Sequence, residues 1–228
     1  VVHGYFPVNE LKQASKKHGV TINQYLVGTF VYAAYKEYMR ERPSKIPFRC
    51  CVPVNLRPYY DSHTMKNFFA MVFATFQPEK ESYTFEEVLE IVAENLKEQI
   101  TPENLNNIMS YNVSNEKNWI LRAVPLVIKN FVMKQVYGAS AKATSATVTN
   151  IGNIELKEPY QKYVEHFYVT LSMSKGQNMK GGICSYNGIL TFTFSSILVD
   201  LSIQKRFFQT IAKDGVSVAV ESNGAYYS

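Results

Sequence analysis

The spacing of apolar residues predicts six helical segments along the chain. In the first, Val8, Leu11 and Ala14 share one face, and the second runs from Tyr25 to Met39 through apolar and small residues. The predicted helices are 8–18, 25–39, 84 to about 100, a helix that restarts at Thr101-Pro102, 118–137, and one from Asp200 or Ser202 to Lys213.

Residues with terminal preferences place several of these helix ends. Gly19 is suited to end the first helix in the left-handed conformation, and Gly138 to end the segment 118–137. Pro125 within that segment either kinks the helix or marks its start. Two helices also begin with a capping box, formed by Thr21 with Gln24 and by Thr84 with Glu87.

Between the helices, short runs of alternating or continuous apolar residues predict strands. Pro53 lies inside one of them and suggests a sheet edge or a bulge. The strand 67–77 is apolar on both faces, so we expect both to be covered. Asn187-Gly188 predicts a hairpin turn. The predicted strands are 49–56, 67–77, one from 143 ending at 150–153, 163–172, 181–186, 189–196 and 215–221.

Helices and strands together predict an α/β fold, a mixed β-sheet covered by helices. The length of 228 residues permits one large domain or two small ones, and we favour a single domain. Hydrophobic residues are 46% of the chain and charged residues 19%, which indicates a packed globular protein. The net charge of +5 is mostly scattered, and no nucleic-acid-binding motif is present. No apolar run reaches the roughly 18 residues of a membrane span.

Three cysteines, two of them adjacent at Cys50 and Cys51, do not form a disulfide framework. On a strand, neighbouring side chains point to opposite faces and cannot easily share a metal ion. We therefore interpret these residues as reduced core cysteines of a cytoplasmic protein. The chain begins at Val1 without methionine, as a piece of a longer protein would.

Familiar catalytic motifs are missing from the sequence. It has no G-x-S-x-G nucleophile elbow, no G-x-G-x-x-G dinucleotide loop and no C-x-x-C or H-E-x-x-H metal motif, so we predict no metal site. The four histidines lie far apart in the sequence, and a structural role is favoured for each.

One uncharged stretch, ATSATVTNIGNIEL from Ala143, carries a row of hydroxyl groups. Strand alternation places Ser145, Thr147 and Thr149 on one face, and Ala146, Val148 and Asn150 on the other. We expect the apolar face to pack on helices. Asn150-Ile-Gly-Asn153 then turns the chain, with a positive φ at Gly152. A second interpretation is that threonine is simply a good strand residue and Asn-x-Gly-Asn a simple turn.

Three stretches in a fixed order resemble the C-terminal half of the CoA-dependent acyltransferase superfamily, which includes chloramphenicol acetyltransferase, condensation domains, alcohol acetyltransferases and wax ester synthases. The resemblance covers nearly all of the chain and depends on the order of the motifs. They are TINQY at the start of a long helix, CVPVNLRP at 51–58 followed by NFF at 67–69, and TVTNIGN at 147–153 before paired strands.

The resemblance implies one half of a two-lobed fold in which a channel between the lobes receives acyl-CoA and an acceptor alcohol, amine or carrier-bound substrate. The family's catalytic base is a histidine in an H-H-x-x-x-D-G motif of the first lobe, and this sequence lacks that motif. Residues 1–228 are therefore expected to be the C-terminal lobe alone, forming one wall of the channel, with acyl-CoA as co-substrate and no metal.

In this interpretation Ser145, Thr147 and Asn150 face the channel and support catalysis as donors to the developing oxyanion. Asn55, Arg57 and Asn67 are candidate substrate-binding residues. For Asn55 and Arg57, bracing of the strand end and loop is favoured, and contact with the CoA phosphates is the alternative. The alternative is a non-catalytic binding module. An isolated lobe should also expose an apolar surface and self-associate, for example as a homodimer.

Overall fold

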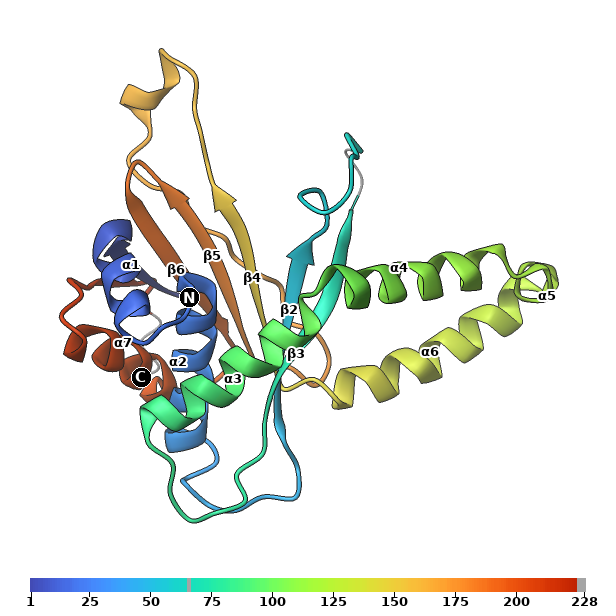
Figure 1. Ribbon diagram of the computed structural model, residues 1–228, viewed down its shortest axis with the longest axis horizontal. Helices are drawn as coiled ribbons and strands as arrows, with labels where there is room; N and C mark the ends of the chain where they lie inside the picture. The colour runs from blue at the N-terminus through green and yellow to red at the C-terminus, as the bar shows by residue number, and fades with distance from the viewer. Residues whose placement is uncertain (65–66, 225–228) are drawn as a thin grey trace.

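The computed structural model describes residues 1–64 and 67–224 and forms one mixed sheet of seven strands with helices against it (Figure 1). The strand order is β3-β2-β4-β5-β6-β1-β7, in which β2, β4 and β5 are parallel and the other neighbours antiparallel. This confirms the α/β class. The strands are β1 (Val2–Pro7), β2 (Phe48–Asn55), β3 (Phe69–Phe76), β4 (Ala146–Asn153), β5 (Met179–Tyr186), β6 (Ile189–Ser196) and β7 (Ala219–Ser222).

Strand β1 was not predicted from the sequence. It is short, contains Gly4 and ends at Pro7, so its local signal is weak. It becomes a strand because β6 and β7, from the other end of the chain, pair with it on both sides.

Helices α1 (Val8–Lys17), α2 (Ile22–Glu37), α3 (Phe85–Gln99) and α7 (Ser202–Lys213) cover one face of the sheet (Figure 1). Both predicted capping boxes are present at the starts of α2 and α3, and Gly19 has the expected positive φ of 71°. The core between helices and sheet is rich in aromatic rings, among them Phe30, Phe192, Phe194 and Phe207. These contacts fix the sheet on α2 and α7.

Helices α4 (Pro102–Lys117), α5 (Trp119–Ala123) and α6 (Leu126–Lys142) form a hairpin that projects beyond the sheet edge at β3 (Figure 1). Pro125 marks the start of α6, one of the two alternatives predicted. The expectation that Gly138 ends this helix is wrong, because α6 continues to Lys142. A glycine ends a helix only when the chain adopts the left-handed conformation there, and Gly138 keeps a helical backbone.

Residues 163–172 do not form the predicted strand. After a short 3₁₀ helix at Tyr160–Tyr163, residues 164–172, which we call the strap, cross the face of the sheet opposite the helices. The backbone N–H of Leu171 donates to Ser195 Oγ at 3.1 Å, and Cys184 Sγ donates to the Phe167 carbonyl at 3.2 Å. Because β5 and β6 already have strand partners on both sides, this alternating segment packs onto the sheet instead of joining it.

Strand β3 is covered on only one face, contrary to expectation. Ala70, Val72 and Ala74 are buried, whereas Phe69 and Met71 on the other face are 41% and 53% exposed. The helix layer lies on a single side of this edge strand. On the second face Arg49 of β2 stacks on the half-buried Phe73, while Phe69 and Met71 remain exposed. The continuous apolar pattern therefore indicates an uncovered surface in this chain.

Candidate functional site

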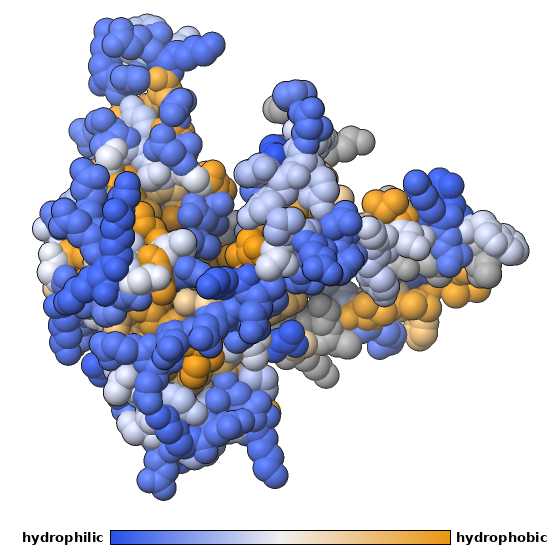
Figure 2. All heavy atoms as spheres, in the orientation of Figure 1, coloured by the Kyte–Doolittle hydropathy of each residue, from blue (hydrophilic) through white to orange (hydrophobic). Residues whose placement is uncertain are grey.

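Parallel strands β2 and β4 are paired over only two residues and then separate. Cys50 pairs with Ala146 and Cys51 with Thr147, whereas β4 stays paired with β5 as far as Asn153. The result is a notch between residues 52–55 of β2 and 148–153 of β4, which we call the β2–β4 opening (Figures 1 and 2). Separating parallel strands leave main-chain groups available at their carboxyl ends, where ligands bind in many α/β proteins.

Pro53 lies just beyond the last β2 residue that pairs with β4. Although β2 is an interior strand, it is a local edge at this position. The sequence-based expectation of an edge or bulge at Pro53 is therefore right locally, because the missing N–H removes no bond that the sheet needs there.

Asn55 and Arg57 lie at the carboxyl end of β2, on one side of the opening. Asn55 Oδ1 accepts bonds from the backbone N–H of Arg57 at 3.1 Å and from its Nη1 at 3.2 Å. Arg57 Nε and Nη2 also donate to the Thr64 carbonyl, at 3.3 and 3.0 Å. These are bracing contacts of the kind favoured from the sequence, and substrate binding by Asn55, Arg57 or the exposed Asn67 stays a prediction.

Asn150 lies across the opening in β4. It is exposed, and its Oδ1 accepts a bond of 2.8 Å from the N–H of Gly152, whose φ is 85° as predicted. The segment does not turn the chain, however. Strand β4 continues to Asn153 with a register shift against β5, so Asn150–Asn153 is a bulge that bends the strand.

Ser145 and Thr147 are at the opposite end of the same strand. Both are half-buried, while Ala146 and Val148 are buried in the core, so the predicted alternation of faces is confirmed for residues 145–149. Asn150, predicted on the same face as Ala146 and Val148, is exposed instead. Ser145 Oγ accepts a bond of 3.1 Å from the N–H of Arg49, and Thr147 Oγ1 donates to Gln177 Oε1 at 2.9 Å. Ser145 and Asn150, five residues apart on a strand, are separated by about 16 Å. The candidate residues therefore form two groups instead of one.

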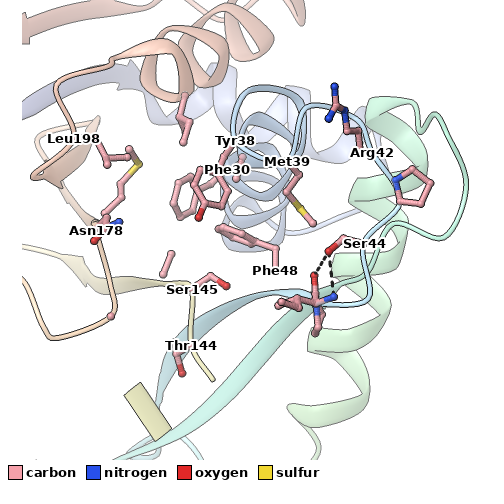
Figure 3. A pocket seen from close by; sticks show the side chains of 18 residues that line it. Phe30, Tyr38, Met39, Arg42, Ser44, Phe48, Thr144, Ser145, Asn178 and Leu198 are labelled. Carbon is pink, nitrogen blue, oxygen red and sulfur yellow. Dashed lines mark hydrogen bonds between the residues drawn. The ribbon is translucent and has the colours of Figure 1, made fainter. Parts of the chain in front are cut away.

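A cavity of about 500 Å³ lies beside Ser145 at the amino ends of β4 and β5 (Figure 3). Phe30, Met39 and Phe48 stand on one side of it, and Asn178 and Leu198 on the other. Apolar side chains supply most of this lining, and the polar groups are few: the Tyr38 hydroxyl, Arg42, Ser44, Thr144, Ser145 and Asn178. Such a space suits an apolar group that ends in a polar one.

The polar residues under the strap were not predicted from the sequence. Lys180 Nζ donates to the Ser172 carbonyl at 2.9 Å and to Ser174 Oγ, and burial lowers the pKa of Lys180. Burial raises the pKa of the neighbouring Cys51 thiol, opposed by the positive charges of Arg49 and Lys180. The sequence contained one indication of this polar group, the single lysine in the otherwise apolar strand MKGGICSY. These contacts hold the strap on the sheet beside Thr147.

All three cysteines are buried and unbridged, as predicted. Within residues 1–64 and 67–224, no three His, Cys, Asp or Glu side chains are grouped in a way that would hold a metal ion. In the same part of the chain, none of the helices combines the length and apolar character that crossing a membrane requires.

No protein-family model matches this sequence, and a search of curated proteins finds no match. Solved structures are similar in fold. A nonribosomal peptide synthetase, FmoA3, aligns over 93% of this chain and 21% of its own, at 15% identity and a TM-score of 0.59. The wax ester synthase/diacylglycerol acyltransferase of Marinobacter aquaeolei VT8 aligns over 93% and 48%, at 12% identity and a TM-score of 0.57.

A third similar structure is the EpoB cyclization-docking bidomain of Sorangium cellulosum, with 12% identity, a TM-score of 0.57, and 94% of this chain and 42% of that chain covered. The chain thus spans about a fifth of the synthetase and about half of the wax ester synthase. At these identities the likeness concerns the fold, and it confirms the acyltransferase-like fold that the motif order indicated.

Proposed function

We propose that this chain, which has the fold of condensation and acyltransferase proteins, is the C-terminal lobe of an acyltransferase and forms one wall of its channel. The observation that carries the proposal is the β2–β4 opening, set in a fold that matches such proteins over 93% of the chain. The base would come from polypeptide outside this sequence, because no H-H-x-x-x-D-G motif is present in it.

The reaction needs few groups from this wall. A histidine of the other lobe removes a proton from an alcohol or amine, the acceptor attacks the thioester carbonyl, and donors stabilise the oxyanion before the thiol leaves. Asn150 presents an amide at the opening, and the bulge at Gly152 sets its direction. Ser145 and Thr147 already bond Arg49 and Gln177, so we assign them to holding β4 and the cavity in place.

The acyl donor is a thioester of CoA or of a carrier protein. The cavity beside Ser145 would take the apolar part of a substrate, because Phe30, Phe48 and Leu198 remove it from water while Arg42 and Asn178 remain for a polar end. A cytoplasmic location, inferred from the unpaired cysteines, belongs to the same proposal.

The test joins the chain to its other lobe and measures acyl transfer. Asn150→Ala is expected to lower kcat by 10-fold or more, in the range for loss of one oxyanion donor. Asp200→Ala is the control for Asn150→Ala. Like Asn150, Asp200 accepts a hydrogen bond from the backbone N–H of the residue two positions later, Ser202, but it lies outside the opening. Ser196→Ala is the control for Ser145→Ala, since each of these hydroxyls accepts a hydrogen bond from a backbone N–H at a strand end. Unchanged turnover in Asn150→Ala would refute the catalytic assignment, and unchanged turnover in Ser145→Ala would refute the supporting role of Ser145 in holding β4.

A second candidate is a binding module without catalysis. The exposed Phe69 and Met71 favour contact with another polypeptide, either the other lobe or a second copy. Sedimentation velocity distinguishes these cases. A stable dimer whose formation needs Met71 would support the module, and a monomer that binds the separately prepared other lobe would support the enzyme.

A further inference from the structure

The hairpin of α4, α5 and α6 carries a large exposed apolar surface. Along α6 the exposed fraction is 81% for Val127, 66% for Phe131 and 62% for Met133, and Trp119 at the tip is 76% exposed. The remaining large apolar residues exposed on the hairpin are Tyr111, Val113, Leu126, Ile128, Val132, Val136 and Tyr137. Monomeric soluble proteins seldom expose so extensive an apolar surface without a binding partner.

The charges in residues 117–142, from the end of α4 through α6, have one sign, and the acidic residues of the hairpin, Glu103 and Glu116, lie in α4. Residues 117–142 contain Lys117, Arg122, Lys129, Lys134 and Lys142, and no aspartate or glutamate occurs from 117 until Glu155. Lys117, Arg122 and Lys134 are exposed. A second copy of the same hairpin would bring like charges together in an apolar contact, so the charge pattern disfavours self-pairing through this surface.

Apolar residues occur on several sides of α6. The 3.6-residue period of the helix places Val127 and Phe131 on one side of α6. It places Val132 and Val136 on another side, and all four residues are exposed. A flat protein surface would cover only one of these sides. The boundary between headgroups and acyl chains surrounds a helix that enters it, while lysine stems extend their ammonium groups back to the headgroups.

We propose that the α4–α6 hairpin is a membrane-surface anchor that inserts α5 and α6 into the interface of a bilayer rich in anionic lipids. Trp119, together with Lys117 and Arg122 at the tip, lies at headgroup depth, and α6 lies along the surface. At 17 residues and 1.5 Å per residue, α6 is about 26 Å long, and the described helices include none suited to span a membrane. This anchor is independent of the proposed acyl transfer.

Trp119 is the only tryptophan in the sequence, so its fluorescence reports on the hairpin alone. The 228-residue chain is mixed with vesicles of phosphatidylcholine that contain no anionic lipid or about a third phosphatidylserine. We expect the anionic vesicles to shift the emission to shorter wavelength, and lipids brominated near the headgroup to quench it. Binding should weaken by an order of magnitude or more between low and high salt. Each lysine or arginine near an anionic surface raises membrane affinity roughly fivefold, and salt screens this attraction.

Flotation of the same vesicles compares matched variants. Val127→Ser with Phe131→Ser should abolish flotation, and Lys129→Gln with Lys134→Gln should weaken it about 10-fold or more. Ile46→Ser with Val199→Ser is the control, because these side chains are equally exposed but lie outside the hairpin. Circular dichroism checks that each variant is folded.

Three results would overturn the anchor. The first is flotation no greater than that of a soluble protein. The second is equal loss of flotation in the hairpin and control variants. The third is a change from dimer to monomer in Val127→Ser/Phe131→Ser without lipid, which would assign the surface to a protein contact.

Discussion

The backbone carbonyl oxygen of Val169 lies 2.1 Å from the position that a Cβ atom would occupy on Gly182. The strap therefore touches β5 at a point where any side chain would collide with main chain. This contact explains why β5 carries glycine in an otherwise apolar strand, and it places the strap directly on the sheet beside Lys180 and Thr147.

Gly182→Ala should displace the strap, because backbone atoms cannot move aside as a flexible side chain can. We expect a loss of about 1–3 kcal/mol in the free energy of unfolding, the usual range for overpacking. Urea denaturation measures it. Gly138→Ala is the control, since none of the described residues outside its own helix places a heavy atom within 4 Å of the new Cβ, and a helical alanine should raise stability. Equal effects of the two substitutions would contradict the contact.

Asp214 joins three helices and should be important for stability. Its Oδ2 accepts a 2.6 Å bond from Tyr25 OH and lies 2.9 Å from His18 Nε2. Burial, together with this carboxylate, raises the pKa of Tyr25. Asp214→Ala should cost about 1.5–3 kcal/mol, as for a hydrogen bond to a charged group, and Tyr25→Phe less. In a double-mutant cycle the two losses should be less than additive, and full additivity would show that the pair is not coupled.

Arg57 should act by bracing the loop and not by binding phosphate. With both lobes present, Arg57→Gln is expected to change kcat/KM for acyl-CoA and for acyl-pantetheine by the same factor, because pantetheine lacks the nucleotide phosphates. Proteolysis near Thr64 should become faster, since the guanidinium no longer holds that carbonyl. Lys45→Gln, at another exposed base, is the control. A rise in KM for acyl-CoA alone would assign Arg57 to the phosphates.

Tyr5 links β1 to β7 and gives the fold a pH dependence in alkali. Its OH donates to Glu221 Oε2 at 2.8 Å, and burial, followed by that bond, raises the pKa of Tyr5 to about 12. An unfolded tyrosine loses its proton near pH 10, so the folded state binds more protons between the two values. Stability should therefore fall as pH rises from about 10 to 12. Between about pH 10 and 12 the urea midpoint of unfolding should fall less in Tyr5→Phe than in the wild-type protein. The same fall in both proteins would contradict this prediction.

The cavity beside Ser145 should limit the size of the apolar substrate. Met39→Trp reduces its volume and is expected to lower activity on long acyl chains at least 10-fold more than on acetyl. Val220→Trp places the same residue on the exposed strand β7 outside the cavity and should leave the chain-length profile unchanged. An unaltered profile in Met39→Trp would remove the cavity from the substrate path.

Local features were predictable where neighbouring residues decide them. The capping boxes at Thr21 and Thr84 form within one turn, so their bonds need no distant partner. Asn187-Gly188 makes the hairpin between β5 and β6 with positive φ at both residues. The alternation of Ala146 and Val148 with hydroxyl residues was sufficient to orient β4.

Tertiary contacts decided the rest. Strand β1 exists, despite its weak local pattern, because β6 and β7 flank it. The strap has a more strand-like pattern but lies over strands that are already paired on both sides. The hydroxyl groups of Ser145 and Thr147 were predicted to share one strand face, but only the bulge and the early separation of β2 from β4 place Asn150 at the opening, about 16 Å from Ser145. Sequence patterns encode which face of an element avoids water. Which partner covers that face depends on chain segments more than 100 residues away.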